Sequence, residues 1–170
     1  MTAIHDLRIR PAATGDAPLI LALIRELAEY ERLADQAVGT EADIERHLFG
    51  ERPAAEAVVA ELDGEPAGFA LFFTTFSTFL SRPGIWLEDV FVRPEHRRAG
   101  VGRALLEHLA ALAVERGCGR MEWSALDWNE PALAFYRELG ARPLQDWIVH
   151  RLDGEALRSL GAAAGGPAPA

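Results

Sequence analysis

The sequence predicts one mixed α/β domain (α+β mixed), in which a central mixed sheet of about six to seven strands is flanked by helices. Two observations lead to this fold class. Segments with strand-type apolar patterns are interspersed with segments whose apolar residues recur at helical spacing. The chain has 170 residues, 49% of them hydrophobic, which is enough for one core, and it has no internal repeat and no long linker. We therefore expect residues 1–160 to form the domain, and residues 161–170, composed of Gly, Ala and Pro, to be a disordered tail.

In the first half of the chain, turn and cap residues divide the apolar segments into strands and helices. Thr14 or Asp16 is a suitable cap for the first helix, and Thr40 with Asp43 forms a variant of the capping box for the second. Asp63-Gly64 is a strong hairpin signal. The expected elements are strand 7–10, a helix ending near residue 30 or 33, helix 41–48, strand 57–62 and strand 66–75.

In the second half of the chain, a central strand at 85–92 leads into a long amphipathic helix at 101–116. Gly117 is placed to end this helix, and Gly140 to end the next one, which Asn129 caps. The other expected elements are strand 121–125, a last strand at 144–152 and a short helix that starts at Asp153-Gly154.

Composition and charge exclude several classes of function. The net charge of −9 argues against a nucleic-acid-binding protein, which needs clustered Lys and Arg. No apolar run is long enough to span a membrane, and the N-terminus lacks the apolar core of a signal peptide. Cys118 is the only cysteine, which excludes an internal disulfide and fits a reducing cytoplasm. The five His lack the spacing of metal ligands, so we expect no metal site.

The segment 86–102, WLEDVFVRPEHRRAGVG, carries the main functional signal. A buried-type strand leads into a turn and then into glycines at the start of a helix, where free N–H groups and the helix dipole favour an anion. The pattern is neither a Walker loop nor the dinucleotide fingerprint G-x-G-x-x-G. It predicts a ligand with a pyrophosphate, bound beside Glu88 and Asp89; the alternative is a glycine-rich cap on an ordinary helix.

Arg-x-x-Gly-x-Gly at 97–102 resembles the coenzyme A pyrophosphate loop of the GNAT N-acetyltransferases. The segment 129–140, NEPALAFYRELG, is similar to the second cofactor element of that family. Together with Trp147, Arg151 and Leu152 near the end, these motifs resemble the diamine (spermidine/spermine) N-acetyltransferase-like branch, from about residue 7 to 157.

The resemblance implies a GNAT fold, acetyl-CoA as co-substrate without a metal, and typically a homodimer. It also implies direct attack, in a ternary complex, by a primary amine of a small cationic substrate. That substrate is a diamine, a polyamine or a thialysine-like amino acid. Two alternatives stay open: another amine, such as an aminoglycoside or a peptide N-terminus, and a non-catalytic CoA-binding regulatory module.

The resemblance also implies roles for individual residues. Glu88 matches the base, although it can instead bind the cationic substrate or be a surface charge, and Tyr136 matches the acid that protonates the thiolate, or is a core aromatic. Asp89 faces away from Glu88 on a regular strand, and a bulge would bring both carboxylates to the same side. Tyr30 and Glu31 match positions lining the amine channel, or are simply solvated. The expected cofactor-binding residues are Phe91, Val92, Arg97, Arg98, Ala99, Gly100, Val101, Gly102, Asn129, Ala132 and Tyr136. We expect Trp86, Trp123 and Trp128 mainly in the core or at an interface, or one of them against a cationic alkyl-amine.

Overall fold

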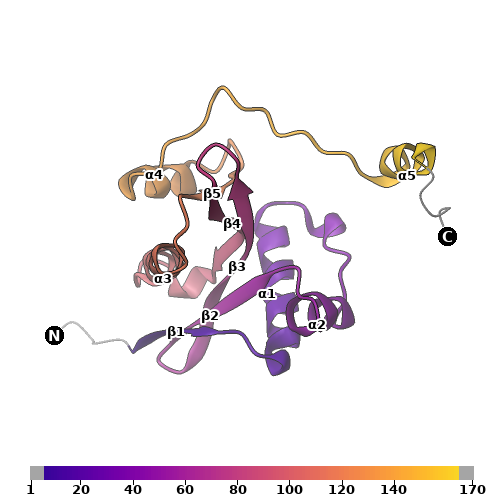
Figure 1. Cartoon of the computed structure of the whole chain (residues 1–170). Coiled ribbons are helices and arrows are strands. Elements are labelled where there is room, and N and C mark those ends of the chain that lie inside the picture. Colours follow the sequence, from indigo (N-terminus) through magenta and orange to yellow (C-terminus); the bar gives the residue numbers. More distant parts are fainter. Residues whose placement is uncertain (1–5, 165–170) are drawn as a thin grey trace. The chain divides into compact units, whose positions relative to one another are not determined.

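The computed structural model (Figure 1) describes residues 6–164, and these divide after Ser124 into two compact units. The first unit contains the sheet, with strands β1 (Leu7–Pro11), β2 (Glu56–Leu62), β3 (Glu65–Ser77), β4 (Arg82–Val92) and β5 (Met121–Trp123). Its α-helices are α1 (Ala17–Tyr30), α2 (Glu41–Phe49) and α3 (Val101–Glu115). The second unit contains α4 (Glu130–Glu138) and α5 (Gly154–Ala163). Short 3₁₀ turns lie at Thr14–Asp16, Ala34–Gln36 and Pro94–His96.

The strands follow one another in the sheet in chain order, β1-β2-β3-β4-β5. Neighbours from β1 to β4 are antiparallel, and β5 is parallel to β4. Because β5 pairs only with Ile85–Leu87, the rest of β4 has no β5 partner on that side among the described residues. The predicted functional segment, residues 86–102, starts within these paired residues of β4 and continues beyond them.

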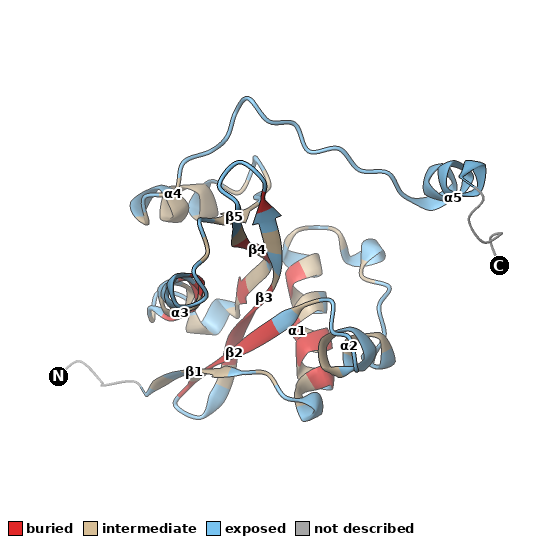
Figure 2. Ribbon diagram, in the orientation of Figure 1, coloured by how far each residue is buried: buried red, intermediate tan, exposed pale blue. Residues whose placement is uncertain are grey.

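Helices cover the two faces of the sheet, with α1 on one side and α3 on the other (Figure 1). Side chains of α1 pack with sheet residues in one apolar cluster: Ile20, Leu23, Leu27, Ala57, Phe69, Leu71 and Phe91. On the opposite side, α3 packs on the sheet with Val101, Leu105 and Leu109 fully buried. The buried residues therefore lie in the sheet and in the helix faces turned toward it (Figure 2).

Local signals in the sequence set several element boundaries, and the capping box, the hairpin turn and the Gly117 helix end are confirmed. The Thr40 hydroxyl accepts a hydrogen bond from the Asp43 N–H at 3.3 Å, and the Asp43 carboxylate accepts one from the Thr40 N–H at 3.0 Å. Asp63 and Gly64 both have positive φ in the β2–β3 turn, as a tight hairpin requires. Gly117 ends α3 with a φ of 69°. The predicted side-chain cap of α1 is not confirmed, because Asp16 occupies the N-cap position without a side-chain cap hydrogen bond.

The predicted last strand at 144–152 is wrong, and the sheet has five strands instead of six to seven. Residues 142–153 form neither helix nor strand. Apolar β-type residues favour a strand, but a strand exists only where its backbone groups find a ladder partner. Strand β5 is also shorter than the predicted 121–125.

The short helix predicted after Asp153 is confirmed as α5. Of the expected tail at 161–170, the first three residues belong to α5, and residues 165–170 lie outside the described residues. None of the helices within residues 6–164 has both the length and the apolar character needed to cross a bilayer.

Candidate active site

A β-bulge in β4 brings the two predicted acidic residues onto the same face of the sheet. Opposite β3, Asp89 pairs with Leu71 and Leu87 pairs with Phe72, so Glu88 is the extra residue between them. Leu71 belongs to the apolar cluster on the α1 face, and therefore Asp89 lies on that face. Without the bulge, Asp89 would share the opposite face with Leu87. The condition stated from the sequence, that a bulge could unite the two carboxylates, is fulfilled.

Three carboxylates influence one another around this bulge. Partial burial is the main cause that raises the pKa of Asp89 from 3.8 to about 6, and the negative charges of Glu88 and Glu31 raise it further. Burial also raises the pKa of Glu31, which directly follows α1. The site thus combines the exposed Glu88 with two half-buried carboxylates, an arrangement that favours a cation.

One of these carboxylates has a neutral hydrogen-bond donor. The indole Nε1–H of Trp86 donates to Oε2 of Glu88 at 2.9 Å. Trp86 pairs with Phe73, which lies two residues from Leu71 and therefore on the α1 face of the sheet. Trp86 and Glu88, two residues apart on β4, project from this same face.

Two arginines hold the end of α1 near the end of β4. Arg93, just after β4, binds the Glu26 carboxylate through two nitrogens at 2.8 and 3.0 Å. The Arg97 guanidinium lies over the ring of Tyr30, with its Cζ 4.6 Å from the ring centroid, and its Nε donates to the Val92 carbonyl at 3.1 Å. Arg97 therefore connects the predicted phosphate loop with the predicted amine site.

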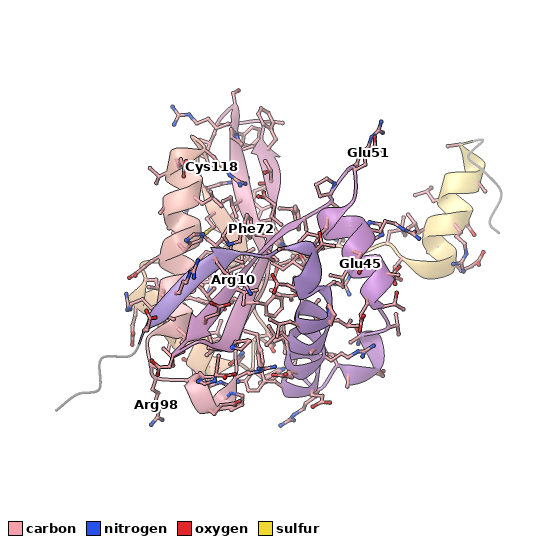
Figure 3. The ribbon with its side chains drawn as sticks, turned by 90° about the horizontal axis from the view of Figure 1, so that it is seen from below. Arg10, Glu45, Glu51, Phe72, Arg98 and Cys118 are labelled. Atoms are coloured by element: carbon pink, nitrogen blue, oxygen red, sulfur yellow. The ribbon has the colours of Figure 1, made fainter. Side chains whose placement is uncertain are left out.

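The loop before α3 has the backbone geometry of an anion-binding helix start. Arg98 and Gly100 have φ values of 64° and 83°, and α3 begins at Val101. No described side chain caps this helix, so its first N–H groups are available to a ligand. A Cβ on Gly100 would meet nothing within 4 Å, and Arg98 projects from the ribbon nearby (Figure 3). These features fit a pyrophosphate group.

The other predicted cofactor residues of the first unit differ in exposure. Phe91 is buried in the cluster with α1, so its side chain belongs to the core. Val92 and Ala99 are half-buried, and Val101 and Gly102 form the first turn of α3.

The remaining predicted residues lie in the second unit. Asn129 caps α4, because its Oδ1 accepts a hydrogen bond from the Ala132 N–H at 3.4 Å. Tyr136 is half-buried within α4, and its ring centroid is 5.7 Å from that of Phe135. The structure therefore groups Tyr30, Glu31, Glu88, Asp89 and the 97–102 loop in the first unit, and Asn129, Ala132 and Tyr136 in the second.

Sequence reasoning did not predict the Trp86–Glu88 hydrogen bond or the Arg97–Tyr30 contact. The Trp86–Glu88 bond had a weak signal in the sequence, because residues two apart on a strand project from the same face. The second joins residues that are distant in the sequence, and no spacing rule connects them.

Comparison with known proteins agrees with this geometry. The family model described as "Acetyltransferase (GNAT) family" matches residues 21–141. Thialysine N-epsilon-acetyltransferase from Bos taurus is 40% identical over 163 residues, which cover 89% of this chain and 95% of that protein. Spermidine/spermine N(1)-acetyltransferase-like protein 1 from Homo sapiens is 30% identical over 94% of this chain and 24% of its own length.

Among solved structures, an integron cassette protein from V. cholerae superposes with a TM-score of 0.77 and 26% identity. The match covers 91% of this chain and 97% of that one. The chain therefore belongs to the GNAT family of N-acetyltransferases.

Proposed function

We propose that this protein transfers an acetyl group from acetyl-CoA to a primary amine of a small cationic substrate, a diamine, a polyamine or a thialysine-like amino acid. The observation that carries the proposal is the β4 bulge, which unites Glu88 and Asp89 on one face beside Glu31. A substrate with several positive charges would match three carboxylates. The relatives named for thialysine and for spermidine/spermine support this substrate class.

The proposed cofactor site uses the uncapped start of α3. Backbone N–H groups from Arg98 to Gly102 would hold the pyrophosphate, and the exposed Arg98 guanidinium would add a charge-assisted bond. The resemblance to the family also assigns Asn129 and Ala132, at the start of α4, to the cofactor. When bound, acetyl-CoA supplies a thioester carbonyl as the electrophile.

In the proposed mechanism, Glu88 accepts a proton from the substrate ammonium, directly or through water, because only the neutral amine has a lone pair for attack. The Tyr136 hydroxyl then donates a proton to the departing thiolate. Asp89 and Glu31 hold the remaining positive charge of the substrate.

A backbone N–H on β4 would stabilise the developing oxyanion. The Arg93 N–H donates to Ala67 of β3, so by alternation Phe91 also points its N–H toward β3. Val90 and Val92 then point theirs to the side where β5 has ended. We therefore assign the donor to Val90 or Val92.

A turnover assay tests this function. Thiol release from acetyl-CoA is followed with putrescine, spermidine, spermine, thialysine, lysine and an aminoglycoside as acceptors. We expect turnover with a diamine, polyamine or thialysine, and a fall in kcat of about 100-fold or more in both Glu88→Gln and Tyr136→Phe. Glu45→Gln, which removes an exposed carboxylate on α2 (Figure 3), is the matched control and should leave kcat unchanged.

Other results would redirect the proposal. Turnover with the aminoglycoside alone would change the substrate class, and peptide amines would be the next acceptors to try. Thermal stabilisation by acetyl-CoA without turnover of any amine would indicate a CoA-binding regulatory module.

We also propose that the protein is a homodimer in which a second copy covers the segment 144–160. Seven large apolar side chains in this segment are exposed: Leu144, Trp147, Ile148, Val149, Leu152, Leu157 and Leu160. Exposed large apolar side chains concentrated in one segment are typical of an interface. We further propose a cytoplasmic location, because Cys118 is the only cysteine in the sequence and has no partner for an internal disulfide.

Sedimentation analysis tests the dimer. Ile148→Glu should produce monomers at concentrations where the wild-type protein is a dimer, because a buried charge opposes association. Val38→Glu places the same charge on an exposed residue outside the segment and should not change the mass. A monomeric wild-type protein would contradict the proposal.

A further inference from the structure

We infer that Trp86 is a positioning residue, whose indole N–H fixes the orientation of the Glu88 carboxylate and leaves its second oxygen, Oε1, to take the proton from the substrate. The inference deepens the proposed function and rests on the proposed role of Glu88. It concerns a residue that the sequence analysis placed mainly in the core or at an interface.

The first step is geometric. Glu88 is the bulged residue of β4, so its backbone lacks the regular pairing that fixes neighbouring side chains. Its side chain is exposed, and the 2.9 Å bond from Trp86 Nε1 to Oε2 is its only hydrogen bond or ion pair among the described residues. Trp86 itself is half-buried and paired on both sides, with Phe73 of β3 and Glu122 of β5. A well-held donor therefore orients a side chain that is otherwise free to rotate.

The second step is chemical. An indole is a neutral hydrogen-bond donor that cannot accept. It restrains one carboxylate oxygen without adding a positive charge, whereas an Arg or Lys partner would stabilise the carboxylate strongly and weaken it as a base. Oε2 can accept the indole bond both before and after Glu88 takes a proton, provided that the proton goes to Oε1. The bond thus selects the oxygen that reacts.

The third step is electrostatic. The charged groups around the pair are mainly acidic: Asp89 and Glu31 on the α1 face, and Glu122, which pairs with Trp86 in register. Glu122 forms an ion pair at 2.7 Å with Arg120, the residue just before β5, so the Arg120 guanidinium compensates the charge of Glu122. The charges of Asp89 and Glu88 repel each other, and without a donor this repulsion would rotate the Glu88 side chain away from Asp89. The Trp86 hydrogen bond opposes that rotation.

Indole NMR spectra test the bond itself, whatever the substrate is. The four tryptophans of the uniformly ¹⁵N-labelled full chain give four indole cross-peaks, and the one that disappears in Trp86→Phe belongs to Trp86. We expect this peak to move upfield in Glu88→Ala, because the proton loses a charged acceptor, while the Trp147 indole peak stays in place. A Trp86 peak that is unchanged in Glu88→Ala would overturn the inference.

Kinetics test the positioning role. Trp86→Phe keeps the ring and removes the donor, so we expect kcat to fall about tenfold with the KM for acetyl-CoA unchanged, as for loss of a hydrogen bond to a charged group. In a Glu88→Ala background the same substitution should change kcat less than about twofold, since Trp86 acts through Glu88. His47→Phe, which removes a ring N–H donor from an exposed position on α2, is the control and should leave kcat unchanged in both backgrounds.

The outcomes separate the two proposals. A full tenfold effect of Trp86→Phe in the Glu88→Ala background would overturn the positioning role and point to packing of the ring. Wild-type kcat in Glu88→Ala would refute the proposed base and, with it, the positioning role. Wild-type kcat in Trp86→Phe, combined with a low kcat in Glu88→Ala, would overturn the positioning role alone.

Discussion

The two units of the chain differ in how they hold their functional residues. In the first unit, the sheet and helices α1 and α3 contain all the buried residues of the described chain (Figure 2). In the second unit, no residue between 125 and 164 is buried, and α4 has a side-chain cap and an ion pair between Glu130 and Arg137. The register of a packed sheet therefore places Glu88 and Asp89 on one face, whereas Asn129 and Tyr136 lie in a unit whose residues 125–164 include none that is buried. The predictions below test this difference, from the largest expected effect to the smallest.

Truncation of an aromatic side chain in each unit should distinguish the two units most clearly, through the loss in the free energy of unfolding. Phe69→Ala removes a fully buried ring from the α1 cluster and should lower the free energy of unfolding by about 3–5 kcal/mol. Phe135→Ala removes a half-buried ring from α4 and should cost roughly 1 kcal/mol. Urea unfolding followed by circular dichroism measures both changes, and equal losses would contradict the comparison.

The acidic cluster should make the first unit sensitive to pH. Because the pKa of Asp89 in the folded protein, about 6, lies above its ordinary value of 3.8, protonated Asp89 favours the folded state. This contribution is fully present below about pH 4 and is lost as the pH rises through about 6. Asp89→Asn should therefore raise the free energy of unfolding at pH 8, by roughly 2 kcal/mol, and should have little effect at pH 4.

Asp146→Asn is the control for this pH effect. It removes an exposed carboxyl from the second unit, so the free energy of unfolding should change by less than about 0.5 kcal/mol at either pH. A gain in Asp89→Asn that is as large at pH 4 as at pH 8 would show that burial of the charge is not the cause.

Two glycines at opposite ends of α3 separate backbone strain from ligand binding. Gly100 and Gly117 have φ values of 83° and 69°, and a Cβ on either would meet nothing within 4 Å. Each Gly→Ala substitution should therefore cost about 1–2 kcal/mol of stability, from the left-handed backbone alone. Only Gly100→Ala should also weaken acetyl-CoA binding, measured by calorimetry, because only Gly100 shapes the N-terminal loop. Equal acetyl-CoA affinity in the two variants would argue against the proposed pyrophosphate site.

The smallest effect is expected at the cap of α4. Asn129→Ala removes the side-chain acceptor for the Ala132 N–H and should cost about 0.5–1 kcal/mol. Amide hydrogen exchange should show faster exchange in α4 and unchanged protection in α1, since α1 belongs to the other compact unit. Faster exchange in both helices would indicate that the units unfold together.

Most of the fold was predictable because its boundaries depend on local interactions. Thr40 and Asp43 start α2, Asp63-Gly64 closes the β2–β3 hairpin, and Gly117 ends α3, each through contacts a few residues apart. By contrast, local signals could not show that the predicted strand at 144–152 would fail to form. Its residues have the β propensity, but pairing depends on a partner strand, which propensity cannot supply.

By itself, the sequence determined the family, the glycine loop before α3 and the identity of the two carboxylates on β4. Only the tertiary structure decided which way those carboxylates face. The register between β3 and β4 places one extra residue at Glu88, and this turns Asp89 toward α1 and Glu31 and leaves Glu88 bonded to Trp86. The physical reason is that strand register follows from the summed packing of two whole strands against the helices, so no local spacing rule reveals a bulge of one residue.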